Sequence, residues 1–213
     1  MNNIKEFALR RLLCDFHIPD SLKNVEFDCP EYVKQVKEAH VQHIAFMAKS
    51  HYGNCFYDTK IGQKCKGLKQ DILREIVPLF HKNGITVQAY YNVWHNNIEG
   101  EKHPDWFQVN ENGMKATGVW DELCLNSPYR EYVIAQLCEI VSNYGVDGFW
   151  LDQVGFSSDT CYCQYCREKY FNKHDDKLKP YSQQNIEEHI KFETFKRDSI
   201  RDFLLECIKR TKS

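Results

Sequence analysis

The 213-residue sequence lacks several features that would assign it directly to a class of protein. Neither sign of charge predominates, because 28 basic and 30 acidic residues give a net charge of −2. A nucleic-acid-binding surface needs a basic surplus on one face, so the balance argues against a nucleic-acid partner. No apolar run approaches the roughly 20 residues of a membrane-spanning helix, which argues against a membrane partner.

The N-terminus also lacks the pattern of an export signal. The stretch MNNIKEFALRRLLCDF has no clean apolar core followed by a small-residue cleavage site. Ten cysteines in a chain without such a signal predict reduced thiols and a cytoplasmic location. The sequence has neither a low-complexity tract nor a Ser/Pro-rich linker, so we expect a single domain over residues 1–213.

What the sequence does contain is an alternation of short apolar runs with helical patterns. The apolar runs cover residues 10–18, 43–50, 85–94 and 146–152. Helical patterns follow them at about residues 29–40, 67–84, 127–144 and 183–210. Four β-α repeats with nearly continuous apolar strands predict an α/β fold in which helices cover a parallel sheet.

Two architectures fit this alternation: a doubly wound open sheet and a (β/α)8 barrel. No Gly-x-Gly-x-x-Gly motif follows an apolar run, which removes the usual reason to favour a dinucleotide-binding sheet. Barrel enzymes carry their functional residues at the C-terminal ends of the strands. The apolar runs end on such residues: His17, His51, Tyr90 with Tyr91 and Trp94, and Asp152. A full barrel takes about 250 residues, so four repeats predict the N-terminal half of a TIM barrel.

Asp152 is the candidate catalytic residue. It follows GFWL at the mouth of the predicted sheet, where a buried charge is costly unless it is used or paired. A carboxylate among aromatic and histidine side chains can act as the nucleophile of a retaining glycosidase, whose second carboxyl group lies about 5–5.5 Å away. A helix cap or a salt-bridge partner is the alternative interpretation. His95 and Gln153 are further candidates for hydrogen bonds to a sugar.

The cysteines Cys161, Cys163 and Cys166 form a Cys-x-Cys-x-x-Cys motif. Three thiols at this spacing are too close for ordinary disulfides across a fold, and they suit a tetrahedral Zn²⁺ ion. We choose Cys124 as the fourth ligand, and the alternatives are His174 and Cys55. Four thiolates would close the coordination sphere and make the zinc structural. The simpler alternative is three reduced cysteines on a loop, or one fortuitous disulfide.

Several segments resemble known glycosidases. AKSHYGNCFYDTKIG, VQAYYNVWH and YVIAQLCEIVSNYGVDGFWLDQ resemble α-L-fucosidases, and the stretch from DFHIPD through CLNSPYRE to the cysteine motif resembles the family catalogued as hypothetical glycosyl hydrolase six. The resemblance covers about residues 10–205 and implies a (β/α)8 barrel. It also implies Asp152 as nucleophile and a sugar subsite lined by His17, His51, Tyr91 and Trp94.

The sequence departs from these families at defined positions. Fucosidases carry a His-His pair where this chain has Ser50-His51, and their acid/base carboxylate is expected beyond Ser213. A cysteine before NSP and a later Cys-x-Cys-x-x-Cys are similar to the zinc site of family forty-two β-galactosidases. The acid/base glutamate of those enzymes would fall at Val154, so the resemblance implies the metal site without their mechanism.

Three functions fit the sequence. The first is a retaining, α-L-fucosidase-like glycoside hydrolase with its acid/base outside this chain. The second is a non-catalytic carbohydrate-binding domain derived from such a barrel, and the third is a zinc-stapled interaction domain. We expect a carbohydrate partner, together with either a homo-oligomer or a missing C-terminal half-barrel that covers the sheet edges.

Overall fold

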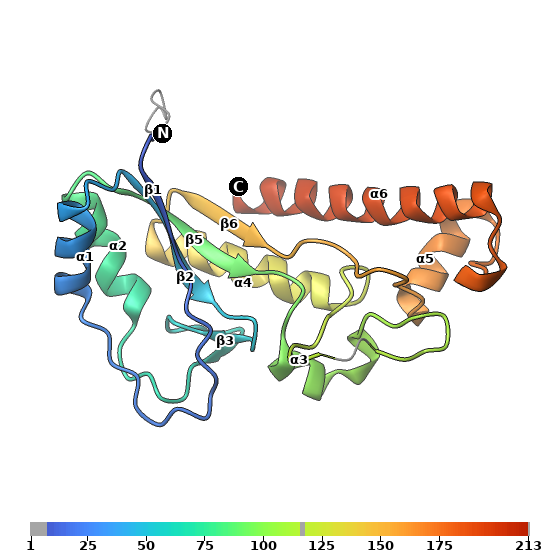
Figure 1. Ribbon diagram of the computed structural model, residues 1–213, viewed down its shortest axis with the longest axis horizontal. Coiled ribbons are helices and arrows are strands. Elements are labelled where there is room, and N and C mark those ends of the chain that lie inside the picture. The colour runs from blue at the N-terminus through green and yellow to red at the C-terminus, as the bar shows by residue number, and fades with distance from the viewer. Residues whose placement is uncertain (1–7, 116–117, 213) are drawn as a thin grey trace. The chain divides into compact units, whose positions relative to one another are not determined.

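The fold is described from a computed structural model over residues 8–115 and 118–212 (Figure 1). Within these residues the chain forms two compact units. The first unit runs to Ser50 and resumes over Asn54–Tyr91 and Glu139–Asp152. The second unit holds His51–Gly53, Asn92–Cys138 and the residues from Gln153 onward. None of the described helices combines the length and apolar character needed to cross a membrane.

The first unit is built on a sheet whose long strands are β1 (Arg11–Cys14), β2 (His43–Lys49), β5 (Thr86–Asn92) and β6 (Gly148–Asp152). β2 pairs in parallel with β1 on one side and with β5 on the other, and β6 lies next to β5. Two short strands, β3 (Asn54–Cys55) and β4 (Gln63–Lys64), extend the sheet beyond the end of β2.

Burial separates the central strands of this sheet from its edges. In β2 every residue from Ile44 to Lys49 is buried, as expected for a strand covered on both faces. The edge strands are more open: Leu13 in β1 and Trp150 in β6 are each 44% exposed. The edges therefore present apolar side chains beside backbone groups that a further strand could pair with.

Two helices of the first unit lie side by side next to the sheet (Figure 1). They are α1 (Cys29–Glu38) and α2 (Ile72–Lys82). Each begins at an aspartate, Asp28 or Asp71, whose side chain accepts a hydrogen bond from the backbone N–H three residues later. Gly84, with φ of +72°, follows α2 and allows the chain to turn into β5.

The second unit is mostly helical. Its elements are α3 (Asn97–Lys102), the 3₁₀ turn Pro104–Trp106, the first part of α4 (Tyr129–Tyr144), α5 (Gln164–His174), the 3₁₀ turn Tyr181–Gln183, and α6 (Ile186–Thr211). α6 begins with a capping box in which Asn185 and Glu188 each bond the other's backbone N–H. The sequence predicts α4 and α6 but not α3 or α5. The prediction of a single domain over residues 1–213 stays a prediction.

Candidate active site and cysteine cluster

In the first unit, Asp152 ends β6 and receives a hydrogen bond from its neighbouring strand. The hydroxyl of Tyr90, on β5, donates to Asp152 Oδ2 at 2.6 Å. Tyr90 is only 2% exposed, so its ring is held by packing. A short bond from a hydroxyl to a carboxylate is among the stronger hydrogen bonds in proteins. Tyr90 therefore fixes the orientation of the Asp152 carboxylate.

His17 approaches the same two residues from the loop after β1. Its ring centroid lies 6.1 Å from that of Tyr90. Burial lowers the pKa of His17; the negative charges of Asp15 and Asp152 oppose the shift and the positive charge of Lys49 adds to it. A lowered pKa makes His17 mainly neutral at pH 7, so that it can both donate to and accept from a hydroxyl group.

Lys49 and Tyr91 lie at the ends of β2 and β5. Both are fully buried, and Lys49 Nζ lies 5.1 Å from the centre of the Tyr91 ring. Successive side chains of a strand point to opposite faces, so Tyr90 and Tyr91 cannot both face Asp152. Tyr90, which sequence reasoning left out of the subsite, makes the bond to Asp152, and the sugar-binding role of Tyr91 stays a prediction.

In the second unit the structure groups three of the predicted sugar-binding residues. The ring of His51 lies 5.0 Å from that of His95, and Trp94 Nε1 donates to His95 Nε2 at 2.8 Å. Trp120, which the sequence analysis missed, stands 4.5 Å from His51 at a right angle. Gln153, by contrast, is exposed, and its backbone has a φ of +55°.

Glycine is required at position 53, two residues after His51, in the histidine cluster that His51 and His95 form. Gly53 has a φ of +101°, and a Cβ atom added there would lie 2.0 Å from Asn96 Oδ1. Asn96 is fully buried and caps α3 through the N–H of Glu99. The close approach of Gly53 to Asn96 therefore ties the loop of His51 to the start of α3.

Glu122 is a second carboxylate near these residues, and it is not among the candidates of the sequence analysis. Its Oε1 atom lies 4.0 Å from His95 Nε2, and its carboxylate accepts a hydrogen bond from the Ser157 hydroxyl. A single β-bridge joins His95 to Glu122. Glu122 thus links the histidine cluster to the loop that follows β6.

The structure also brings Cys124, Cys161, Cys163 and Cys166 together in the second unit. All four are buried, and their sulfur atoms lie within 4.8 Å of one another. Cys124 Sγ lies 3.4 Å from Cys166 Sγ and 3.6 Å from Cys163 Sγ. Zinc–sulfur bonds of about 2.3 Å at tetrahedral angles would place the sulfurs about 3.8 Å apart. The group therefore fits a tetrahedral metal ion.

Neighbouring polar groups support charge on these sulfurs. Asn126 donates from its backbone N–H to Cys124 Sγ at 3.3 Å and from Nδ2 to Cys166 Sγ at 3.2 Å. Lys169 Nζ in turn donates to Asn126 Oδ1 at 2.8 Å, and Ser199 accepts from Nδ2. Such outer contacts orient metal ligands and stabilise thiolates.

The thiol pKa values depend strongly on this packing. Burial raises the pKa of Cys124 well above its usual range. Hydrogen bonding with the other three thiols lowers the pKa of Cys163, and the Cys166 N–H at the start of α5 adds to the effect. A divalent cation would stabilise all four thiolates, and the thiol pKa values would then no longer differ in direction from one cysteine to the next. Of the two alternative fourth ligands, His174 packs on Tyr170 instead, with ring centroids 4.5 Å apart, and Cys55 belongs to the first unit.

The sequence model of the family described as hypothetical glycosyl hydrolase 6 matches residues 28–153, more than half of the chain. The chain belongs to this family. No protein with a curated description matches the chain.

Solved structures with the same fold include glycosidases. α-L-Fucosidase isoenzyme 2 from Paenibacillus thiaminolyticus superposes with a TM-score of 0.81 at 23% identity, over 96% of this chain and 31% of that enzyme. A β-galactosidase from Rahnella sp. R3 superposes with a TM-score of 0.72 at 17% identity, over 98% of this chain and 34% of that enzyme. A hypothetical protein from Ruminiclostridium thermocellum ATCC 27405 superposes with a TM-score of 0.59 at 15% identity, over 85% of each chain.

These likenesses show the fold. The chain spans about a third of the length of either glycosidase. The predicted fold class, an α/β barrel of which only part is present, is thereby confirmed.

Proposed function

We propose that this chain supplies the nucleophile of a retaining glycoside hydrolase that acts on α-L-fucosides. One oxygen of Asp152 would attack the anomeric carbon while the glycosidic C–O bond breaks and the acid/base protonates the leaving oxygen. Water would then hydrolyse the glycosyl-enzyme intermediate and release the Asp152 carboxylate. The 2.6 Å bond from Tyr90 supports this role most directly, because it holds the carboxylate at a strand end, where barrel enzymes place catalytic groups. Membership of a glycosyl hydrolase family supports the reaction class.

The remaining groups of the proposed site have distinct roles. The histidines and the aromatic side chains would bind the hydroxyls and the apolar face of the sugar. The proposed substrate-binding residues are His17, His51, Tyr91, Trp94, His95 and Gln153. The acid/base carboxylate would come from outside this chain.

We further propose that a C-terminal half-barrel or a second copy of the chain supplies that carboxylate. The exposed apolar side chains of the edge strands β1 and β6 support such a partner. The limited share of each solved glycosidase that this chain spans also supports it.

We propose Zn²⁺ as the ion that the cysteine cluster holds. Cys124, Cys161, Cys163 and Cys166 would be its ligands, and four thiolates leave no open position for catalysis. Its role would be to fix the loop that follows β6. Since none of the ten cysteines forms a disulfide, we also propose a cytoplasmic location.

The amount of fluoride released in the first, rapid phase of the reaction with 2-deoxy-2-fluoro-fucosyl fluoride tests the proposed nucleophile. Fluoride leaves without a general acid, so the reaction should proceed although the acid/base lies elsewhere. We expect the wild-type chain and Asp147→Asn, a control in the turn that leads into β6, to release one fluoride per chain. Asp152→Ala should release none. Absence of a burst from a folded wild-type chain would refute the proposal.

A further inference from the structure

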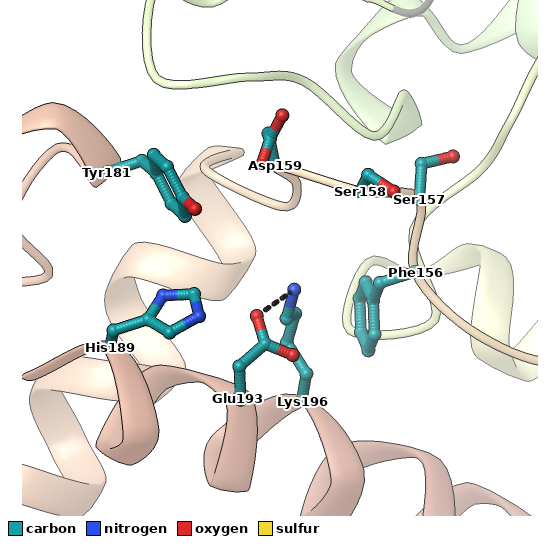
Figure 2. Close-up of a pocket in the computed structure, with 8 residues that line it drawn as sticks. All are labelled: Phe156, Ser157, Ser158, Asp159, Tyr181, His189, Glu193 and Lys196. Atoms are coloured by element: carbon teal, nitrogen blue, oxygen red, sulfur yellow. Dashed lines mark ion pairs between the residues drawn. The ribbon is translucent and has the colours of Figure 1, made fainter. Parts of the chain in front are cut away.

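The second unit also contains a pocket of about 330 Å³ between the loop after β6 and the first half of α6. Figure 2 shows it with its lining residues: Phe156, Ser157, Ser158, Asp159, Tyr181, His189, Glu193 and Lys196. Its volume lies at the lower end of the range for small-molecule sites, about 300–1,000 Å³. We propose that this pocket binds one neutral pyranose unit of a saccharide, as a site separate from the chemistry at Asp152.

Two aromatic rings form opposite walls of the pocket. Figure 2 shows Tyr181 on one side and Phe156 on the other, with the polar side chains of α6 between them. Phe156 packs against the buried cluster around the cysteines, so its ring has a firm support. The Tyr181 ring stands at 85° to that of His189, 5.2 Å away. The accessible lining of the pocket is mainly polar, so the two rings bound the space while the polar side chains would make most of the contacts with a sugar.

The floor of the pocket presents a hydrogen-bond acceptor next to a donor. Lys196 is 8% exposed, its Nζ lies 2.6 Å from Glu193 Oε1, and the Phe192 ring supports it at 5.0 Å. Among the described residues Glu193 is the sole ion-pair partner of Lys196, so two of the three N–H groups of the ammonium can serve a ligand. A carboxylate beside an ammonium matches two neighbouring sugar hydroxyls, each of which both donates and accepts.

The loop wall is fixed before any ligand binds. Gln108, fully buried, accepts hydrogen bonds from the Ser157 N–H at 3.0 Å and from the Thr160 hydroxyl at 2.9 Å. The Ser157 carbonyl oxygen also lies 2.9 Å from Thr160 Oγ1, so the one hydroxyl proton of Thr160 is shared between these two acceptors. A wall that is already ordered lowers the entropic cost of binding.

Charge favours a neutral ligand over an anionic one. Glu193 and Lys196 compensate each other, whereas Asp159 has no hydrogen-bond or ion-pair partner among the residues that the structure describes. The pocket therefore carries about one net negative charge when His189 is neutral, and it would repel a uronic acid or a sugar phosphate. A second hollow of about 250 Å³ shares Tyr181 and His189, which gives room for a neighbouring sugar unit.

Titration with the neutral trisaccharide 2′-fucosyllactose, followed by amide NMR signals, tests the proposal. We expect the signals of Ser158 and His189 to shift with a dissociation constant on the order of 1 mM. Tyr181→Ala and Glu193→Gln should each weaken binding about tenfold or more. Phe171→Ala serves as control, because Phe171 is 46% exposed and Tyr181 45%.

Three results would overturn the assignment. They are unshifted signals at about 50 mM trisaccharide, an unchanged affinity in Tyr181→Ala, and tighter binding of glucuronate than of the neutral probe. Asp152→Ala should leave the titration unchanged, and loss of the shifts in that variant would assign them to Asp152 instead. The titration therefore tests the pocket proposal alone, and the release of fluoride tests the proposed nucleophile alone. A failure of one proposal can be distinguished from a failure of the other.

Discussion

Replacement of Asn126 by alanine gives a quantitative test of the cysteine cluster. The side chain of Asn126 donates to Cys166 Sγ at 3.2 Å and accepts from Lys169 at 2.8 Å. Asn126→Ala removes both contacts but keeps the backbone N–H that donates to Cys124 Sγ at 3.3 Å. One of the two N–H···S bonds from Asn126 is therefore lost while the four ligands remain.

The expected magnitude follows from the role of such outer contacts. Loss of an outer-shell partner typically lowers metal affinity about 10–100-fold. At a fixed free zinc concentration well above both dissociation constants, this corresponds to about 1.4–2.7 kcal/mol less stabilisation of the folded chain. We therefore expect Asn126→Ala to lose zinc to a chelator at a correspondingly lower chelator concentration and to unfold at a lower temperature.

The assay is competition with a chromophoric zinc chelator, with thermal unfolding measured at the same free zinc concentration. Asn172→Ala is the matched control, because Asn172 is an exposed asparagine on α5. An Asn126→Ala affinity within about twofold of the control would refute the assigned role of the N–H···S bond. A wild-type chain that takes up no zinc would refute the zinc assignment itself.

Two further predictions concern the first unit. Tyr90→Phe removes the 2.6 Å bond to Asp152, so we expect it to slow sugar labelling about 10–100-fold; a rate equal to wild type would contradict the positioning role. Because burial lowers the pKa of His17, the unfolded chain binds more protons below about pH 6.5, and stability falls as the pH drops through that range. Chemical unfolding measures the free energy of unfolding at pH 7 and at pH 5. Between these two pH values, His17→Gln should lose less of this free energy than wild type or His40→Asn, an exposed control. An equal loss in all three would contradict this account.

The sequence predicts the strands and the long helices because their apolar residues recur with a clear period. α5 is different, since only Cys166 and Tyr170 of its residues are buried. It has no apolar stripe that a periodicity could detect, and the cysteine cluster holds its first turn instead. Both buried residues of α5 contact residues that are distant in the sequence, because Cys166 lies at Cys124 and the Tyr170 ring packs on that of Phe195.

The candidate site was predictable to a similar extent. Asp152 and the histidines stand at strand ends, where a sequence pattern can find them. Trp120 and Glu122 come from an irregular loop, and single contacts such as the bridge between His95 and Glu122 position it. The choice between Tyr90 and Tyr91 depended on which face of β5 meets Asp152, and only the structure determines that.

The site of covalent attachment tests the central claim most directly. After incubation with 2-deoxy-2-fluoro-fucosyl fluoride, the chain would be digested and the modified peptide sequenced by mass spectrometry. We predict one fluorofucosyl group on the peptide that contains Asp152, with the fragment masses assigning it to that carboxylate. A label on another residue, or a folded chain that remains unlabelled, would contradict the assignment of Asp152 as the nucleophile.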